Sequence, residues 1–307
     1  MNPNLIDDDD INDLPDLESF KNMLSSLKSS IPPTASVDEI AKVFYDHAIM
    51  HTQLYGLINP SNFARLSFYR VRLNIDFACE DLGLIRTYSY PPASACKTNG
   101  RANIKGKSVF YCSDDALTAI YESKPKVGDI GYISIWNTQK VDRFVKYAIC
   151  LPKDLRADNK WAISTREAHE YSEKHSQTRG ANKAAQLDLL NQFLSIQFIE
   201  EREPYLLTSW LSDNLLYHDS KADFIAYPSI VANTQHCNLA FHPNSVDTLL
   251  TFKKVVRFKI LEVVDSPKGL IMSTGKIAEL NGSILQWRDA IKGELPFLGK
   301  ITDIPRP

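Results

Sequence analysis

Cysteine is scarce in this sequence, and the cysteines that occur are not paired. There are 5 among 307 residues, an odd number, and no two of them form a Cys-x-x-Cys pair. A disulfide framework needs an even set of cysteines, and a structural zinc site needs closely spaced ligands, so the pattern argues against both. We expect the cysteines to be reduced, small and mostly buried side chains.

Long hydrophobic runs are missing as well. No stretch reaches about 18 apolar residues, the length that a membrane-spanning helix needs. The first residues, MNPNLIDDDDINDLPD, lack the basic region and the apolar core of a signal peptide. The sequence therefore predicts a cytoplasmic protein without a membrane partner, in which residues 1–15 form a disordered acidic tail.

The sequence also has no excess of one charge and none of the common nucleotide-binding motifs. Its 35 basic and 37 acidic residues give a net charge of -2, which provides no general attraction to nucleic acid. Neither G-x-G-x-x-G nor G-x-x-x-x-G-K-[ST] occurs, so Rossmann and P-loop sites are not indicated. His236 and His242 flank Cys237 without a carboxylate at ligand spacing, and we therefore predict no metal site.

Helical periodicity marks an amino-terminal extension over residues 16–65. Apolar residues recur at helical spacing from Leu17 to Leu27, and the two prolines of IPPTAS should end this helix. Such an extension can cover the core, contact a partner or build a homo-oligomer, and covering the core is favoured. Ser36 can cap a second helix, whose apolar face would hold Ile40, Val43, Phe44 and His47.

Alternating apolar and β-branched residues predict a sheet from residue 66 onward. A short helix, SDDALTAIYES, follows the second strand with Ser113 or Asp114 as its cap, and residues 161–219 are mostly helical with an apolar stripe along LDLLNQFLSIQFIEE. We therefore expect an α+β domain over 66–265 with a helical insertion at 161–219, followed by a C-terminal extension, 266–307. The strand candidates are residues 67–73, 108–112, 131–138, 143–151, 223–231, 237–242 and 251–264.

Residues 99–122 place a cation, a phenol and a carboxylate at regular intervals. Arg101 lies in the loop GRANIKG, Tyr111 follows ten residues later on a strand, and Glu122 eleven residues after that on a helix. Glycines beside an arginine allow close backbone approach to a phosphate, which the guanidinium can bind. On spacing alone, however, a surface loop with a solvated helical glutamate is the more common arrangement.

Ser229 is a second candidate, because Pro228 places its hydroxyl at the end of a strand. A serine nucleophile needs a histidine partner and is typically found in a G-x-S-x-G elbow. Neither surrounds Ser229, so nucleophilic hydrolysis is poorly supported. A turn hydroxyl bonded to the backbone is the simpler interpretation of this residue alone.

Three segments together resemble the RES domain family. GRANIKGKSVFYCSDDALTAIYE is similar to its motif G-R-x-N-x-x-G, followed by a strand ending in Tyr and a helix carrying Glu. YPSIVANTQHCNLAFHP resembles its Tyr-Pro-Ser segment and Asn-Leu strand, and SFYRVRL resembles its opening Tyr-Arg strand. The Arg, Glu and Ser for which the family is named map onto Arg101, Glu122 and Ser229.

This resemblance implies an NAD+-degrading toxin with a fold similar to that of ADP-ribosyltransferases, a mixed or antiparallel central sheet flanked by helices. NAD+ is then the substrate rather than a cofactor, and the bond between nicotinamide and ribose is cleaved by inorganic phosphate in a phosphorylase or by water in a glycohydrolase. A cognate antitoxin of the Xre type is the implied partner.

The resemblance also assigns roles to the matched residues. Glu122 would stabilise the oxocarbenium-like transition state and hold the ribose hydroxyls. Arg101 would bind the pyrophosphate or an incoming phosphate, with Arg70 sharing that task.

Finer roles fall to four further polar residues. Tyr111 would stack on nicotinamide or bond the ribose, and Ser229 with Asn238 would orient the amide or a ribose hydroxyl. Asn103, in the same motif as Arg101, is a further candidate for substrate binding.

The chain also departs from a compact RES domain. More than a hundred residues separate Glu122 from Ser229, and they include the helical insertion, which would serve as a lid, an oligomer surface or a partner-binding element. Two other functions therefore stay open. One is an ADP-ribosyltransferase that modifies a macromolecule, and the other is a catalytically silent module for nucleotide binding or interaction.

Overall fold

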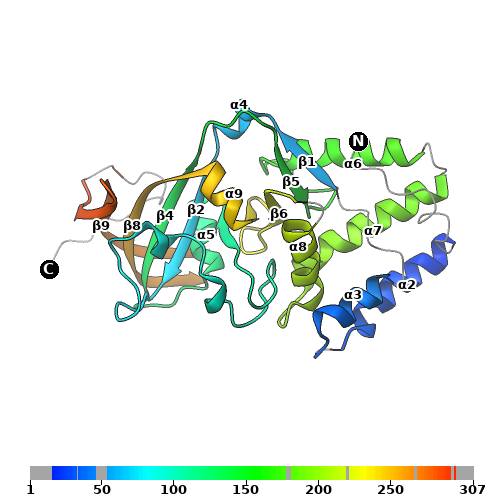
Figure 1. Ribbon diagram of the computed structural model, residues 1–307, viewed down its shortest axis with the longest axis horizontal. Coiled ribbons are helices and arrows are strands. Elements are labelled where there is room, and N and C mark those ends of the chain that lie inside the picture. Colours follow the sequence, from blue (N-terminus) through cyan, green and yellow to red (C-terminus); the bar gives the residue numbers. More distant parts are fainter. Residues whose placement is uncertain are drawn as a thin grey trace.

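The computed structural model describes residues 16–32, 34–45, 54–177, 181–218, 221–265, 268–291 and 294. The predicted acidic tail, 1–15, lies outside the described residues. Within them, strands gather at one end of an elongated molecule and most helices at the other (Figure 1). The strands are β1 (Tyr55–Ile58), β2 (Ser67–Leu73), β3 (Phe110–Ser113), β4 (Ile130–Thr138), β5 (Val145–Ile149), β6 (Phe224–Pro228), β7 (Cys237–Phe241), β8 (Leu250–Asp265), β9 (Lys268–Asn281) and β10 (Ile284–Asp289).

The described helices lie before the strands and between them along the chain. Two precede the sheet, a short one follows β3, and three in succession separate β5 from β6, where the helical insertion was predicted. They are α2 (Leu17–Ser30), α3 (Val37–Tyr45), α4 (Pro60–Phe63), α5 (Ala116–Glu122), α6 (Ala162–Gln177), α7 (Ala181–Glu200), α8 (Leu206–Tyr217) and α9 (Pro243–Leu249), with the 3-10 turns η1 (Ile85–Tyr88) and η2 (Ala93–Ala95).

The described strands form one mixed sheet in the order β1-β5-β6-β7-β3-β2-β4-β8-β9-β10. Neighbouring strands are antiparallel except β5 and β6, which are parallel and are connected through α6, α7 and α8. The fold class is therefore α+β, as the sequence predicted. Strands β9 and β10 extend this sheet beyond β8, so residues assigned to a C-terminal extension pair directly with the main sheet.

The two faces of the sheet are covered differently. One face, which includes Phe110 and Phe224, packs into a large aromatic core. On the opposite face, α7 and α8 cover the region of β5, β6 and β7 and are themselves covered by α2 and α3, whereas α5 covers β2, β4 and β8. Side chains alternate between the faces of a strand, so Tyr111 and Asn238 leave β3 and β7 on this second face. They lie between the two groups of helices.

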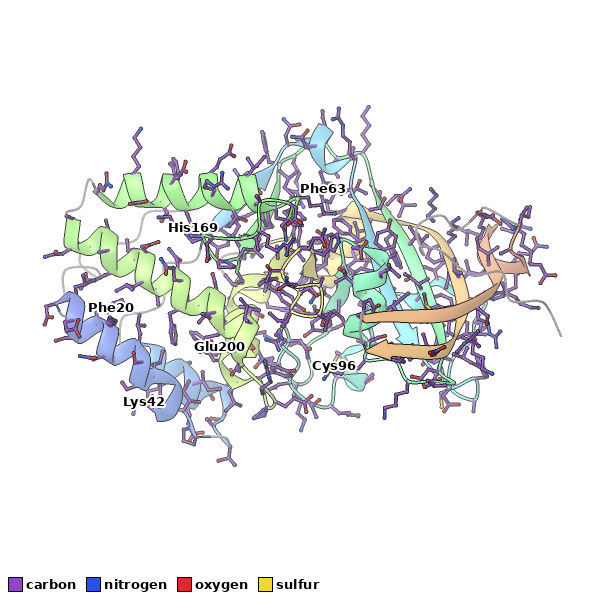
Figure 2. The ribbon with its side chains drawn as sticks, turned by 180° about the vertical axis from the view of Figure 1, so that it is seen from behind. Phe20, Lys42, Phe63, Cys96, His169 and Glu200 are labelled. Atoms are coloured by element: carbon purple, nitrogen blue, oxygen red, sulfur yellow. The ribbon has the colours of Figure 1, made fainter. Side chains whose placement is uncertain are left out.

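The amino-terminal helices cover the core, as predicted. Helix α2 lies along α7 and buries Phe20, Leu24 and Leu27 against it (Figures 1 and 2). Helix α3 begins after Ser36, whose hydroxyl accepts a hydrogen bond from the Glu39 amide at 3.2 Å while the Glu39 carboxylate accepts from the Ser36 amide at 2.7 Å. This reciprocal pair is a capping box. The side chains of Phe44 and His47 lie outside the described residues.

Three local predictions were wrong for identifiable reasons. The cap of α5 is Asp115, whose carboxylate accepts from the Thr118 amide at 2.8 Å, because Ser113 still belongs to β3. Ile196 in the predicted apolar stripe is 43% exposed. The stripe included the successive residues 196–198, which cannot all face one side of a helix. Strand β1 was missed because four residues are too few to show an alternating pattern.

The cysteines are free, and Cys112, Cys150 and Cys237 are buried, which confirms most of the expectation for them. Cys79 is exposed and Cys96 is partly exposed. Among the described residues, we find no helix with the length and apolar character that crossing a bilayer requires.

We expect Phe20→Ala to lower the free energy of unfolding by about 3–5 kcal/mol, because Phe20 is 1% exposed and its loss leaves a cavity between α2 and α7. Urea denaturation checks this value. Leu17→Ala, on the same helix but 37% exposed, is the control and should change stability much less. Equal effects of the two substitutions would show that α2 is not docked as described.

Candidate active site

Glu122 ends α5 with its carboxylate held by two neutral donors. Ser229 Oγ donates to Glu122 Oε1 at 2.6 Å, and Asn238 Nδ2 donates to the same oxygen at 2.7 Å. Oε2 accepts no hydrogen bond from the described residues, and no lysine or arginine among them pairs with this carboxylate. The carboxylate is thus fixed in position but keeps one oxygen and its full charge available.

The sheet and α5 bring these three residues together. Asn238 lies on β7 with Ser113 of β3 and Tyr227 of β6 as its register partners. Ser229 directly follows β6, next to the Pro228–Cys237 pair that ends this ladder. Helix α5 is two turns long, and its Ala116 and Ile120 pack on the sheet, which directs Glu122 back toward β7. Ser229 and Asn238 lie on either side of the loop between β6 and β7, so the position of this loop decides whether both can reach Glu122.

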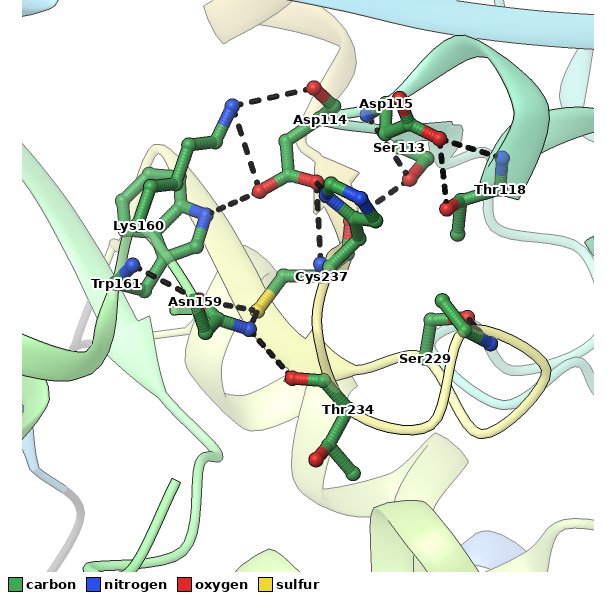
Figure 3. Close-up of polar contacts among 12 residues, drawn as sticks. Ser113, Asp114, Asp115, Thr118, Asn159, Lys160, Trp161, Ser229, Thr234 and Cys237 are labelled. Carbon is green, nitrogen blue, oxygen red and sulfur yellow. Dashed lines mark hydrogen bonds and ion pairs between the residues drawn. The ribbon is translucent and has the colours of Figure 1, made fainter. Parts of the chain in front are cut away.

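Asp114, one residue beyond β3, anchors that loop (Figure 3). Its Oδ1 accepts from the Cys237 amide at 3.1 Å and lies 3.6 Å from His236 Nδ1. Its Oδ2 accepts from Trp161 Nε1 at 2.7 Å and lies 3.4 Å from Lys160 Nζ. A buried carboxylate is stable only when paired and hydrogen-bonded in this way.

The same network reaches Ser229 through the loop backbone. Asn159 Nδ2 donates to the Thr234 carbonyl at 2.8 Å, while the Ser229 amide donates to the His236 carbonyl at 3.0 Å. The Thr234 amide closes the loop on the Ser229 carbonyl at 2.9 Å. The position of the Ser229 hydroxyl on Glu122 therefore depends on contacts that begin at Asp114.

Asp114 and His236 shift each other's ionisation. Burial raises the pKa of Asp114, but the hydrogen bond with His236, the charge of Lys160 and the Trp161 donor outweigh it and lower the pKa below the ordinary value. The hydrogen bond with Asp114 raises the pKa of His236, with burial opposing. The Asp115 charge also raises it, and Lys160 lowers it.

Tyr111 and the loop before β3 form a second group. The Tyr111 hydroxyl accepts from the Ala102 amide at 2.7 Å and donates to Asn103 Oδ1 at 2.8 Å. Gly100 and Asn103 bond each other through their backbones, and a Cβ on Gly100 would lie 2.4 Å from Asn103 Oδ1. A larger residue at position 100 would displace the Asn103 amide and the Tyr111 hydroxyl, whose polar groups hold the loop that carries Arg101.

Arg101 joins this loop to the helical insertion. Its Nη1 donates to the Phe198 carbonyl, its Nη2 donates to the Glu201 carbonyl at 3.1 Å, and its guanidinium lies 5.0 Å from the centre of the Tyr205 ring. No acidic side chain among the described residues pairs with it. The insertion, which sequence reasoning left unexplained, thus positions a cation whose charge is not neutralised.

Arg70 lies apart from Glu122. It points to the opposite face of the sheet from Tyr69, where its guanidinium lies 5.5 Å from the Phe110 ring centre and donates to the Tyr111 carbonyl at 2.9 Å. Its Nε is buried without a partner, and burial lowers the pKa of Arg70 to about 10. Its role in substrate binding stays a prediction.

The predicted residues thus form two groups on one face of the sheet, with Arg70 on the other. Glu122, Ser229 and Asn238 are directly bonded, whereas Arg101, Asn103 and Tyr111 form the second group. Sequence reasoning gave Asp114 only a capping role, because its partners come from distant segments. It also missed Tyr227, which the Tyr-Pro-Ser segment contains but which carries no catalytic signal of its own. The described residues contain no cluster of three side chains suited to a metal ion.

The fold and this site define an α+β protein that holds, on one face of its sheet, a fixed carboxylate without an ion-pair partner and, in a second group, a cation without one among the described residues. The family model described as the RES domain matches residues 83–257, more than half of the chain, so the chain belongs to the RES domain family. The match includes Arg101, Glu122 and Ser229 together with the whole helical insertion. Membership supports a function related to NAD+. No curated protein matches the chain.

We expect Asp114→Asn to lower the free energy of unfolding by about 3 kcal/mol near pH 6, because Lys160 and protonated His236 lose their buried partner. A raised pKa means that the contribution of His236 is complete below its ordinary value of 6.5 and is lost as the pH rises through the raised value. The difference from wild type should therefore shrink toward about pH 9.

Chemical denaturation at both pH values measures this difference. Asp158→Asn is the control: this exposed residue lies in the segment between β5 and α6 that also carries Lys160, pairs with Arg156, and should have a small effect at both. A difference for Asp114→Asn that does not change with pH would contradict the pairing with His236.

Proposed function

We propose that the protein consumes NAD+ by cleaving the bond between nicotinamide and ribose, with inorganic phosphate or water as the acceptor. The observation that carries this proposal is the state of Glu122. One oxygen is fixed by Ser229 and Asn238, and the other has no partner among the described residues. Membership of the RES domain family supports the same substrate.

The chemistry explains why such a carboxylate is useful. Loss of nicotinamide leaves positive charge on the ribose, and a carboxylate against the ring stabilises that charge in the transition state. Neutral donors position Glu122 without cancelling its charge, as an arginine or lysine would. A fixed orientation also means that little reorganisation is needed when the cation forms.

Arg101 supplies the complementary charge. The carbonyls of Phe198 and Glu201 and the ring of Tyr205 orient its guanidinium, but none of them neutralises it. A guanidinium can bind two phosphate oxygens at once, so the pyrophosphate of NAD+ or an incoming phosphate is its expected ligand. The Tyr111 hydroxyl is already used by Ala102 and Asn103, which favours contact with substrate through its ring.

Product analysis by NMR or mass spectrometry tests the proposal and identifies the acceptor. Purified protein is incubated with NAD+, with and without phosphate. ADP-ribose as the product indicates that water is the acceptor, and ADP-ribose phosphate indicates that phosphate is. A parallel incubation with labelled NAD+ and cell lysate tests for a third outcome, in which lysate proteins carry the label because they are ADP-ribosylated. A toxin role with an Xre-type antitoxin is part of the proposal and predicts that the activity arrests cell growth. No release of nicotinamide under any of these conditions rules the proposal out.

Glu122→Gln should lower kcat at least about 100-fold while changing the affinity for NAD+ little, because the lost charge acts mainly in the transition state. Glutamine keeps the oxygen that Ser229 and Asn238 bond, so the site should stay assembled. Steady-state kinetics and calorimetric titration measure the two effects. Glu170→Gln on the exposed face of α6 is the control, and an equal loss of binding would contradict the role of Glu122.

Arg101→Lys should raise KM for NAD+ about tenfold or more, since an ammonium cannot reproduce the planar fork. Kinetic titration of NAD+ checks this change. Arg202→Lys is a matched control, because Arg202 also donates to backbone carbonyls at the end of α7 but is exposed. Full activity of Arg101→Lys would contradict bidentate binding and show that Arg101 contributes only its positive charge.

A further inference from the structure

Tyr227 lies on β6 next to Asn238, one of the two residues that hold the Glu122 carboxylate. It is the register partner of Asn238, so both side chains leave the sheet on the face where Asn238 donates to Glu122. Its ring packs on Phe198 of α7 with ring centres 5.4 Å apart, and only 5% of the residue is exposed. Tyr227 therefore lies between the helical insertion and the residues that hold Glu122.

The Tyr227 hydroxyl has no hydrogen-bond partner among the described residues. Among the other buried tyrosines, the hydroxyl of Tyr88 donates to the Leu82 carbonyl at 3.1 Å and that of Tyr147 donates to Ser164 Oγ at 3.2 Å. The hydroxyl of Tyr132, like that of Tyr227, has no partner among the described residues, but Tyr132 lies in the aromatic core on the opposite face of the sheet. The Tyr227 hydroxyl is not one of the buried polar atoms left without a partner, so it is accessible although the rest of the residue is buried. An accessible donor on this face, with no protein group bonded to it, can bond a ligand that enters the site.

The charges around Tyr227 are those of the site. Burial raises the pKa of Tyr227 well above its ordinary value, with Tyr111 and Glu122 raising it further and Arg101 opposing them. The phenol therefore stays protonated and keeps a proton to donate. The groups that influence it belong to both halves of the candidate site, the carboxylate and the cation.

We propose that the Tyr227 hydroxyl donates a hydrogen bond to an oxygen of the nicotinamide ribose of NAD+ and so contributes to substrate specificity. This inference rests on the proposed function. The ribose is the part of NAD+ that Glu122 must contact, and Asn238, which bonds Glu122, is the register partner of Tyr227. A neutral donor at this place binds the sugar without adding positive charge beside the developing cation.

Tyr227→Phe tests the contact, because it removes the hydroxyl and keeps the ring on Phe198. The variant is compared with wild type by calorimetric titration with two ligands. ADP-ribose contains the second ribose, which carries nicotinamide in NAD+, whereas ADP contains only the adenosine ribose. We expect the affinity for ADP-ribose to fall about 3- to 10-fold, the affinity for ADP to stay unchanged, and KM for NAD+ to rise by a similar factor. The melting temperature should stay equal or rise, because no protein hydrogen bond is lost.

Tyr88→Phe is the matched control. Its hydroxyl bonds the Leu82 carbonyl, so this variant should melt at a lower temperature and bind ADP-ribose as wild type does. Unchanged ADP-ribose affinity in Tyr227→Phe, or an equal loss for ADP, would overturn the inference while NAD+ consumption by wild type stands. Wild-type protein that neither binds ADP-ribose nor consumes NAD+ would overturn the proposed function, and the inference with it.

Discussion

Two hydrogen bonds that converge on one oxygen of Glu122 are the constraint on which the rest of the site depends. They require that Ser229 at the end of β6, Asn238 on β7 and the last residue of α5 meet within hydrogen-bond distance. The buried Asp114 network fixes the loop between β6 and β7, and the packing of Ile120 fixes α5. Much of the polar interior therefore serves to orient one carboxylate without neutralising it.

The helical insertion also helps to position the residues of the site. The Phe198 carbonyl in α7 and the Glu201 carbonyl just after it bond Arg101, and the Phe198 ring packs on Tyr227, so the insertion contacts both groups of site residues. Helix α2 in turn covers α7. The insertion thus lies within the family match and completes the surroundings of the matched residues. The stability of the helical layer is therefore coupled to the geometry of Arg101.

Much of this arrangement could be predicted from the sequence. Alternation located most strands, and the order of three short motifs placed Glu122, Ser229 and Asn238 in one site, because strands β3, β6 and β7 are neighbours in the sheet. The hydrogen bonds around Asp114 and the contacts of Arg101 with Phe198, Glu201 and Tyr205 could not be predicted. Both depend on backbone carbonyls or on side chains far away in the chain, and a backbone carbonyl has no sequence signature. Tyr227 was missed because its distinguishing property, an unbonded hydroxyl on the strand beside Asn238, depends on strand pairing.

The central claim is that the unpartnered oxygen of Glu122 faces the ribose of NAD+. The most direct measurement is a crystal structure of Glu122→Gln, which should be inactive and retain substrate, with NAD+ bound. We predict a hydroxyl or ring oxygen of the nicotinamide ribose within about 3 to 3.5 Å of the side-chain nitrogen that replaces the unpartnered oxygen of Glu122. The ribose bound away from residue 122, with the two hydrogen bonds from Ser229 and Asn238 still in place, would contradict it.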